Sequence, residues 1–231
     1  MLTFPFGMPI TPVCQADRSR KRVFILGVYA SAVHARWIST TGRTIINALA
    51  VASEPEIFWR GDGADQIVAQ IKMPAGAGTL VPANSTLNGP SGIALDEKFI
   101  EPLGLDRTRV WLCDLLPESR CNPNQSFALE REYLPLMPRL GLPSYNFPPV
   151  PKMLASDNRV SEIEQEILDA APEVLITLGD QPLKWFARRY GSCATLAEYG
   201  EVAEQYGRFH DIEIAGHSLK LLPLVHPRQA G

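Results

Sequence analysis

Two continuous apolar runs, one near each end of the chain, most strongly limit the folds that it can adopt. The first covers residues 23–26 and ends at Gly27, and the second covers residues 221–225 and ends at His226. Continuous apolar runs bounded by turn residues are typical of the central strands of a parallel sheet, and α/β proteins bind their ligands at the carboxyl ends of such strands. We therefore expect a cleft with a glycine turn on one side and an imidazole on the other.

The rest of the sequence predicts strands that alternate with helices. Strands are expected over residues 22–27, 56–60, 109–114, 174–179 and 220–226. Helices are expected over residues 43–52, 95–103 and 161–171. Two more are expected, one capped by Asn124 or Ser126 and one that begins at Asp180. A hairpin is expected over residues 209–222. This order predicts a three-layer α/β/α fold around a central, mostly parallel sheet of four or five strands.

The length fits a single domain over residues 1–231. Residues 1–20 are interpreted as an N-terminal extension. Residues 61–92 are rich in Gly, Pro, Asn and Ser and are expected to form an irregular loop region. The chain begins without a basic region followed by an apolar stretch and has no apolar run of membrane-spanning length, so we expect a cytoplasmic protein. We also expect a monomer.

Charge and cysteine content exclude several classes of function. The net charge of −3 at pH 7 gives no global attraction for nucleic acid, so a polyanionic partner would have to bind local patches. Cys14, Cys113, Cys121 and Cys193 form no C-x-x-C pair, which argues against a zinc or iron–sulfur cage and against a disulfide framework. Cys113 lies in a predicted strand and is expected to be a small buried hydrophobe. We expect no metal and no cofactor.

Four segments together resemble the uracil-DNA glycosylase superfamily, most closely its thermophile-type family 4 branch. They are VFILGVYAS, GPSGIALDEKFIEPLGLDRTRVWLCDLLPESRCNPN with the helix REYL after it, VLITLGDQPLKWF and LLPLVHPR, in this order. The family hydrolyses the N-glycosidic bond of a damaged, deaminated base after flipping the nucleotide out of DNA. The resemblance implies a monofunctional DNA glycosylase of base-excision repair, with single- or double-stranded DNA as its partner.

The resemblance also implies catalytic residues. His226 stands where the family places the histidine that donates to the base oxygen; the alternative is a histidine that only closes the sheet edge. Gly27, Tyr29 and Ser31 match the catalytic loop that holds the water, and Val28 and Ala30 match its base-gripping positions. The family acid is missing from this loop, which predicts slower chemistry because a general base contributes about 10²–10⁴-fold. Ser31 and His34 are candidate water ligands, with helix capping or a place in the first helical turn as the alternative.

Base recognition departs from the family pattern. Asp114 occupies the position of an asparagine that reads the base edge. An ionised carboxylate only accepts hydrogen bonds, so Asp114 should disfavour uracil and favour a base with an amino or N–H donor, unless it is protonated. The alternative is that Asp114 only caps the following turn. Leu87 and Asn88 stand where the family has its stacking aromatic, which leaves Tyr29 as the candidate ring, with core packing as the alternative.

Other implied positions concern DNA contacts and the iron–sulfur cluster of family 4. Arg228, Arg120, Asn122, Asn124 and His34 are the predicted DNA-binding residues. Only Cys14 and Cys121 lie near cluster positions and Glu130 stands at the last one, so no cluster is expected. Family members usually continue past the position of Gly231 into a helix that faces the phosphate, and the sequence leaves open whether the native protein is short or this site is incompletely built.

Two alternatives to a glycosylase remain. One is a catalytically weak or inactive member of the superfamily that binds nucleic acid or a nucleotide. The other is an unrelated flavodoxin-like domain, for which residues 27–30 make a poor phosphate-binding turn.

Overall fold

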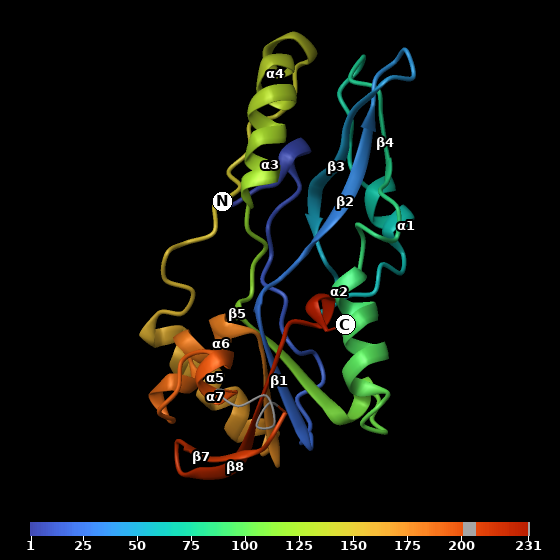
Figure 1. The fold of residues 1–231 in the computed structure, drawn as a ribbon. Helices are drawn as coiled ribbons and strands as arrows, with labels where there is room; N and C mark the ends of the chain where they lie inside the picture. Colours follow the sequence, from blue (N-terminus) through green and yellow to red (C-terminus); the bar gives the residue numbers. More distant parts are fainter. Residues whose placement is uncertain (201–206, 231) are drawn as a thin grey trace.

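A five-stranded sheet forms the centre of the computed structural model, which describes residues 1–200 and 207–230 (Figure 1). Its strands are β5 (Val110–Leu116), β1 (Val23–Tyr29), β6 (Val174–Leu178), β8 (His217–Leu224) and β7 (His210–Ile214), in this spatial order. The first four are parallel, and β7 joins β8 as an antiparallel hairpin. The predicted mostly parallel sheet is confirmed, as is the hairpin that leads into the last strand.

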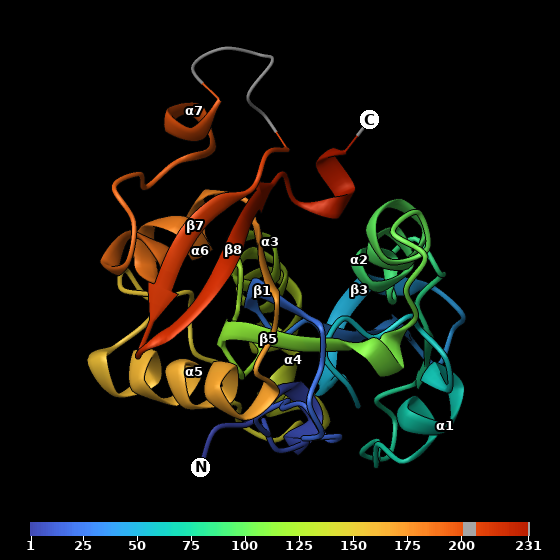
Figure 2. The same ribbon diagram turned by 90° about the horizontal axis from the view of Figure 1, so that it is seen from below.

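Helices cover both faces of this sheet, as Figure 2 shows. One face carries α5 (Asp157–Ala170), α6 (Asp180–Trp185) and α7 (Leu196–Tyr199), and the other carries α2 (Pro90–Leu95) and the π-helix η2 (Asp96–Ile100). Successive strand residues point to opposite faces. Accordingly, Phe24 packs in the cluster with α5 and Ile25 packs in the cluster with α2. The three-layer α/β/α fold is therefore confirmed.

A second sheet was not predicted. Strands β2 (Ala32–Ile38), β3 (Thr44–Ser53) and β4 (Thr79–Pro82) form an antiparallel sheet in the order β3-β2-β4. The helix expected over residues 43–52 is therefore wrong. That short apolar run fits either periodicity, and it becomes a strand because the turn around Gly42, with a φ of 82°, returns it onto β2.

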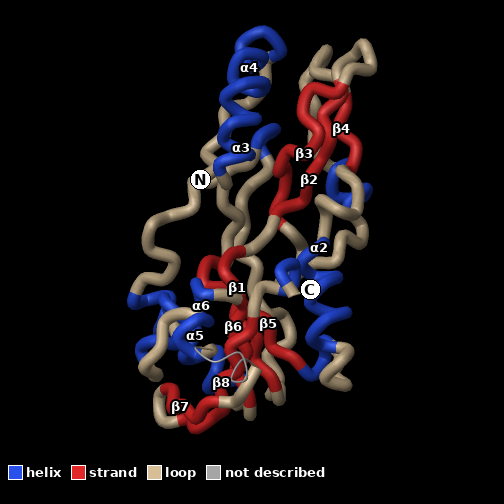
Figure 3. The backbone as a smooth tube through the Cα atoms, in the orientation of Figure 1, coloured by secondary structure: helices blue, strands red, loops and turns tan. Residues whose placement is uncertain are grey.

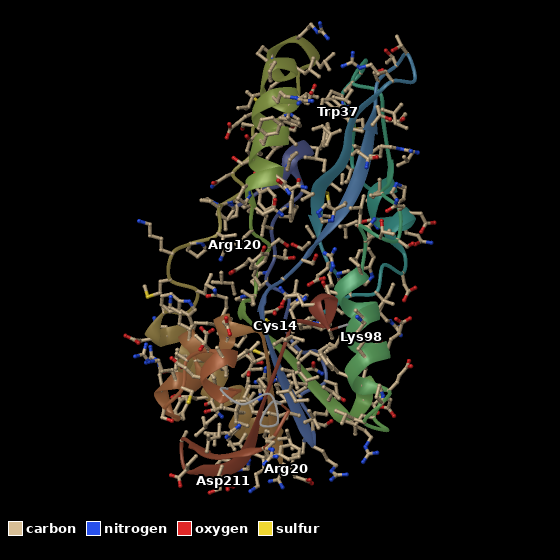
Figure 4. The ribbon with its side chains drawn as sticks, in the orientation of Figure 1. Cys14, Arg20, Trp37, Lys98, Arg120 and Asp211 are labelled. Carbon is tan, nitrogen blue, oxygen red and sulfur yellow. The ribbon has the colours of Figure 1, made fainter. Side chains whose placement is uncertain are left out.

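The N-terminal residues belong to the core of this second sheet and are more than an extension. Phe4, Phe6 and Ile10 are buried. The ring of Phe6 meets those of Trp37 and Tyr133 at centroid distances of 5.3 and 5.2 Å. Tyr133 ends the π-helix η4 (Leu129–Tyr133), which joins α3 (Pro123–Ala128) to α4 (Leu134–Leu140) in one helical column (Figure 3). Figure 4 shows Trp37 between this column and the sheet.

Several predicted boundaries also change. Residues 61–92 are not wholly irregular, because they contain α1 (Ala64–Ala69), β4 and the start of α2. No strand forms over residues 56–60. The caps of α3 and α5 are Asn122 and Ser156, ahead of the positions expected from the sequence. Short 3-10 turns lie at Pro5–Gly7, Arg107–Arg109, Ala187–Arg189 and Pro227–Gln229.

Candidate active site

A cavity of about 650 Å³ lies between the two sheets, at the carboxyl ends of β1 and β8. It brings together most of the residues that the sequence singled out. The predicted residues in its wall are Val28, Tyr29, Ala30, Ser31, His34, Leu87, Asp114, Arg120, Asn122, Asn124, His226 and Arg228. Residues 28–31 and the imidazole of His226 therefore share one cavity, as expected, but the predicted turn at Gly27 is wrong because β1 continues to Tyr29. Gly27 and Asn88 do not line it.

The loop after β1 is held from three sides. The N–H of Ala30 donates to the carbonyl of Leu116 at 3.1 Å. The N–H of Ser31 donates to Oε1 of Glu54 at 2.9 Å, and the hydroxyl of Ser119 donates to the carbonyl of Ser31. Ser31 precedes β2, so the expectation that it caps a helix is wrong. These bonds fix a polar backbone segment against the cavity.

Gly27 acts by leaving space. It lies opposite Asp114 in the register of β1 and β5. A Cβ atom at position 27 would lie 2.3 Å from Oδ1 of Asp114 and 2.7 Å from Cζ of Phe58. Real Cβ contacts are never this short, so any side chain here would displace the carboxyl or the ring. Gly27, which lies within β1, thus makes room for both groups in the cavity wall.

Asp114 is a buried carboxyl group facing the cavity. It lies within β5 and is 4% exposed, which does not fit the alternative of a turn cap. Burial raises its pKa to about 7, and the positive charge of Arg159 acts in the opposite direction. Arg159 also donates from Nη2 to the backbone carbonyl of Asp114 at 2.8 Å. Near neutral pH this group therefore exchanges between the acid and the carboxylate.

Glu54 is a second carboxyl group that sequence reasoning missed. It follows the end of β3, lines the cavity and is 5% exposed. Burial first, and then the charge of Asp114, raise its pKa to about 8, while backbone hydrogen bonds from Ser31 and Trp59 oppose the shift. The loop after β1 contains no acid, but the second sheet delivers one beside it. The only signal in the sequence was an acidic residue two positions after the mainly apolar run of residues 45–52.

An aromatic ring also reaches the cavity from an unexpected position. Phe58 lines the wall in contact distance of Gly27 and has a φ of 52°, a strained value for a residue other than glycine. The N-terminal part of α2 packs against its backbone, since a Cβ atom at Gly92 would lie 2.0 Å from the carbonyl oxygen of Phe58. Tyr29 is half-buried in the same wall and belongs to none of the three apolar clusters of the described residues.

Asn88 has a structural place behind the wall. Its Oδ1 accepts from the N–H of His34 at 2.7 Å, and its Nδ2 donates to the carbonyls of His34 and Ala83 at 2.9 and 3.2 Å. These bonds attach the segment before α2 to β2. Neighbouring Leu87 lines the cavity but offers no ring.

His226 is arranged as a directional donor. Its Nδ1 accepts from the backbone N–H of Arg228 at 3.3 Å, which leaves the proton of the neutral ring on Nε2. Burial and then the charge of Arg228 lower its pKa and favour this neutral form. His226 follows β8, which lies between β6 and β7, so it does not close a sheet edge. Arg228 is exposed at the rim of the cavity.

The remaining predicted contacts come from β2 and from the segment before α3. His34 is half-buried on β2, so its placement in a first helical turn is wrong. Arg120 pairs with Glu118 through Nη2 at 2.9 Å. Asn122 caps α3 by accepting from the N–H of Gln125 at 3.0 Å, and Asn124 is exposed. His34, Arg120, Asn122 and Asn124 all line the cavity, as does Gln125.

Cys113 is buried, as expected. Within the described residues, no cluster of three or more His, Cys, Asp or Glu side chains is arranged to hold a metal ion. In the same part of the chain, no helix combines the length and apolar character needed to cross a membrane.

The sequence matches no protein-family model and no curated protein.

Proposed function

We propose that the cavity hydrolyses the N-glycosidic bond of a damaged base that is flipped out of DNA. The observation that carries this proposal is the meeting of a neutral imidazole, a backbone loop and two buried carboxyl groups on one cavity. This set supplies what the reaction needs: a donor for the leaving base, a holder for water and a proton acceptor.

The roles follow from position. Glu54, beside the loop of residues 28–31, orients a water molecule and accepts its proton as the oxygen bonds to the sugar carbon. The electron pair of the broken glycosidic bond leaves with the base, and the Nε2 proton of His226 stabilises that negative charge. Asp114 faces the base edge, and Phe58 or Tyr29 stacks on the base face.

The two carboxyl groups work best with one proton between them. The ionised group serves as base, while the protonated group offers both an O–H donor and a C=O acceptor, as an asparagine amide does. Their pKa values of about 7 and about 8 are close, so placing the proton on Asp114 and the charge on Glu54 costs little free energy, on the order of 1 kcal/mol. This is less than the contribution of a positioned general base, about 10²–10⁴-fold in rate.

The proposal is tested with oligonucleotides, single- and double-stranded, that carry uracil, hypoxanthine, xanthine or other deaminated and alkylated bases. We expect abasic product with the wild-type protein and its loss in His226→Ala. Tight binding of a lesion without product would instead favour a nucleic-acid-binding protein, and neither binding nor product would refute both functions.

A further inference from the structure

The segment directly after β3 carries two of the groups assigned to the reaction. Glu54 begins this segment, and Phe58 lies further along it. A Cβ atom at Gly27 would lie 2.7 Å from Cζ of Phe58 and 2.3 Å from Oδ1 of Asp114. The edge of the Phe58 ring and the carboxyl group of Asp114 are therefore neighbours in the cavity wall.

A rare backbone conformation directs this ring. Phe58 has a φ of 52°, a left-handed value that residues other than glycine adopt only where their surroundings hold it. Arg107, in the 3-10 turn before β5, supplies such a hold. Its Nη2 donates to the carbonyl oxygen of Phe58 at 2.7 Å, and its Nη1 donates to that of Ile57 at 3.4 Å. Because the carbon atoms of these two carbonyl groups are the ends of the φ torsion of Phe58, one guanidinium restrains that rotation.

Arg107 is itself fixed to the helix that starts with α2. The carboxylate oxygens of Asp96 accept from its Nε at 2.9 and 3.1 Å, and Asp96 is the first residue of η2, which continues α2. Its Nη2 also donates to the carbonyl oxygen of Gly92, within α2, at 3.4 Å. Hydrogen bonds between charged groups are stronger than those between neutral groups. The side chains of Arg107 and Asp96 are only 20% and 13% exposed, so water competes little for these bonds.

We propose that Arg107 is a positioning residue that holds Phe58 as the ring on which the extruded base stacks. This inference rests on the proposed function and selects Phe58 over Tyr29 as the stacking ring. Arg107 does not line the cavity, so it acts on the base only through the backbone that it restrains. Without the guanidinium, Phe58 is free to return to an ordinary negative φ, which turns its ring away from Asp114.

A positioning role and a purely structural role change different kinetic constants. Loss of the stack weakens binding of the base before and during the reaction alike, which raises KM and leaves kcat nearly unchanged when chemistry is slow. A structural defect lowers the fraction of folded enzyme and hence the apparent kcat, while the molecules that remain folded keep their KM. Stacking of one base on an aromatic ring corresponds to a change of about 5- to 150-fold in KM.

The test is a double-mutant cycle of Arg107→Gln and Phe58→Leu. It measures kcat and KM for base release from the lesion oligonucleotide that gives most abasic product with the wild-type protein. We expect Arg107→Gln to raise KM by about 5- to 150-fold with kcat nearly unchanged. In the Phe58→Leu background the same change should raise KM by less than about twofold, because no ring is left to position. An equal rise in both backgrounds would overturn the inference.

Arg107→Lys tests the geometry of the hold. Lysine keeps a positive charge for Asp96 but lacks the planar fork that reaches the carbonyl groups of Ile57 and Phe58 together. Its KM should therefore be raised towards that of Arg107→Gln, and a wild-type KM in Arg107→Lys would overturn the inference.

Arg109→Gln is the matched control, because Arg109 is exposed on the same 3-10 turn and does not line the cavity. Its KM and kcat should equal those of the wild-type protein. An unchanged KM in Arg107→Gln, whether or not kcat falls, would overturn the inference and leave the proposed function intact. Absence of abasic product from every oligonucleotide with the wild-type protein would overturn both.

Discussion

Replacement of Glu54 by glutamine should stabilise the folded protein at alkaline pH while it removes activity. The pKa of Glu54 rises from an ordinary value of 4.5 to about 8, because the side chain is buried next to Asp114. Between these two pH values the folded protein retains a proton that the unfolded chain has lost. The free energy of unfolding therefore falls as the pH increases through this window.

The magnitude follows from the size of the shift. At about 1.4 kcal/mol per pKa unit, the wild-type protein loses about 5 kcal/mol between pH 4.5 and pH 8 through this one group. Glutamine is neutral throughout and keeps an oxygen for the N–H of Ser31. The stability of Glu54→Gln relative to the wild-type protein should thus rise by about this amount over the window, and the proposed glycosylase activity should fall by about 10²–10⁴-fold.

Urea denaturation at about pH 5 and about pH 8 measures the two free energies of unfolding. Glu213→Gln is the control, since Glu213 is exposed on β7 and lies outside the cavity. Its stability difference should be independent of pH over this range. If Glu54→Gln showed the same flat difference, or were less stable than the wild-type protein at pH 8, the assignment of Glu54 as a buried, raised carboxyl would be wrong.

Three further changes test separate parts of the site. Asp114→Asn should move base preference towards uracil above about pH 7, where the wild-type carboxyl group is ionised, and should lower the pKa of Glu54 by removing a neighbouring charge; equal uracil excision by both forms in this pH range would count against Asp114 as the base reader. Gly27→Ala should lower the free energy of unfolding, measured by urea denaturation, by about 1–3 kcal/mol, because its methyl group meets the Asp114 carboxyl group and the Phe58 ring. An unchanged free energy of unfolding would contradict this crowding. Arg228→Gln should weaken the binding of DNA of any sequence to the same extent, and should reduce the salt dependence of the DNA-binding constant by about one phosphate contact. An unaltered salt dependence would show that Arg228 does not contact DNA phosphate.

The central sheet was predictable because its strands are buried on both faces. Residues 23–26 and 110–113 read as continuous apolar runs, and residues 174–178 as a run interrupted by Thr177 alone; all three are too short for buried helices. The positions of Asp114 and His226 followed, since the carboxyl ends of neighbouring parallel strands lie at one edge of a sheet. The strand ends thus predicted which of these groups would meet.

The second sheet and the groups it delivers were not predictable in the same way. The apolar residues of 44–53 fit a helix as well as a strand, and the choice depends on the hairpin with β2 and on packing against the N-terminal residues. Glu54 lies 23 residues from Ser31 in sequence and reaches it only because that hairpin returns the chain. Phe58 likewise depends on a strained backbone conformation that α2 supports.

The most direct test of the proposed function is the pH dependence of base release under single-turnover conditions, from about pH 5 to about pH 10, on whichever lesion gives most abasic product in the oligonucleotide assay. Below about pH 7 both carboxyl groups are protonated and no proton acceptor remains, while above about pH 8 both are ionised and repel the base edge. The account predicts a bell-shaped profile with its maximum between about pH 7 and about pH 8, which disappears in Glu54→Gln. A profile that is flat over this range, or the same bell in Glu54→Gln, would contradict the claim that the paired carboxyl groups carry the chemistry.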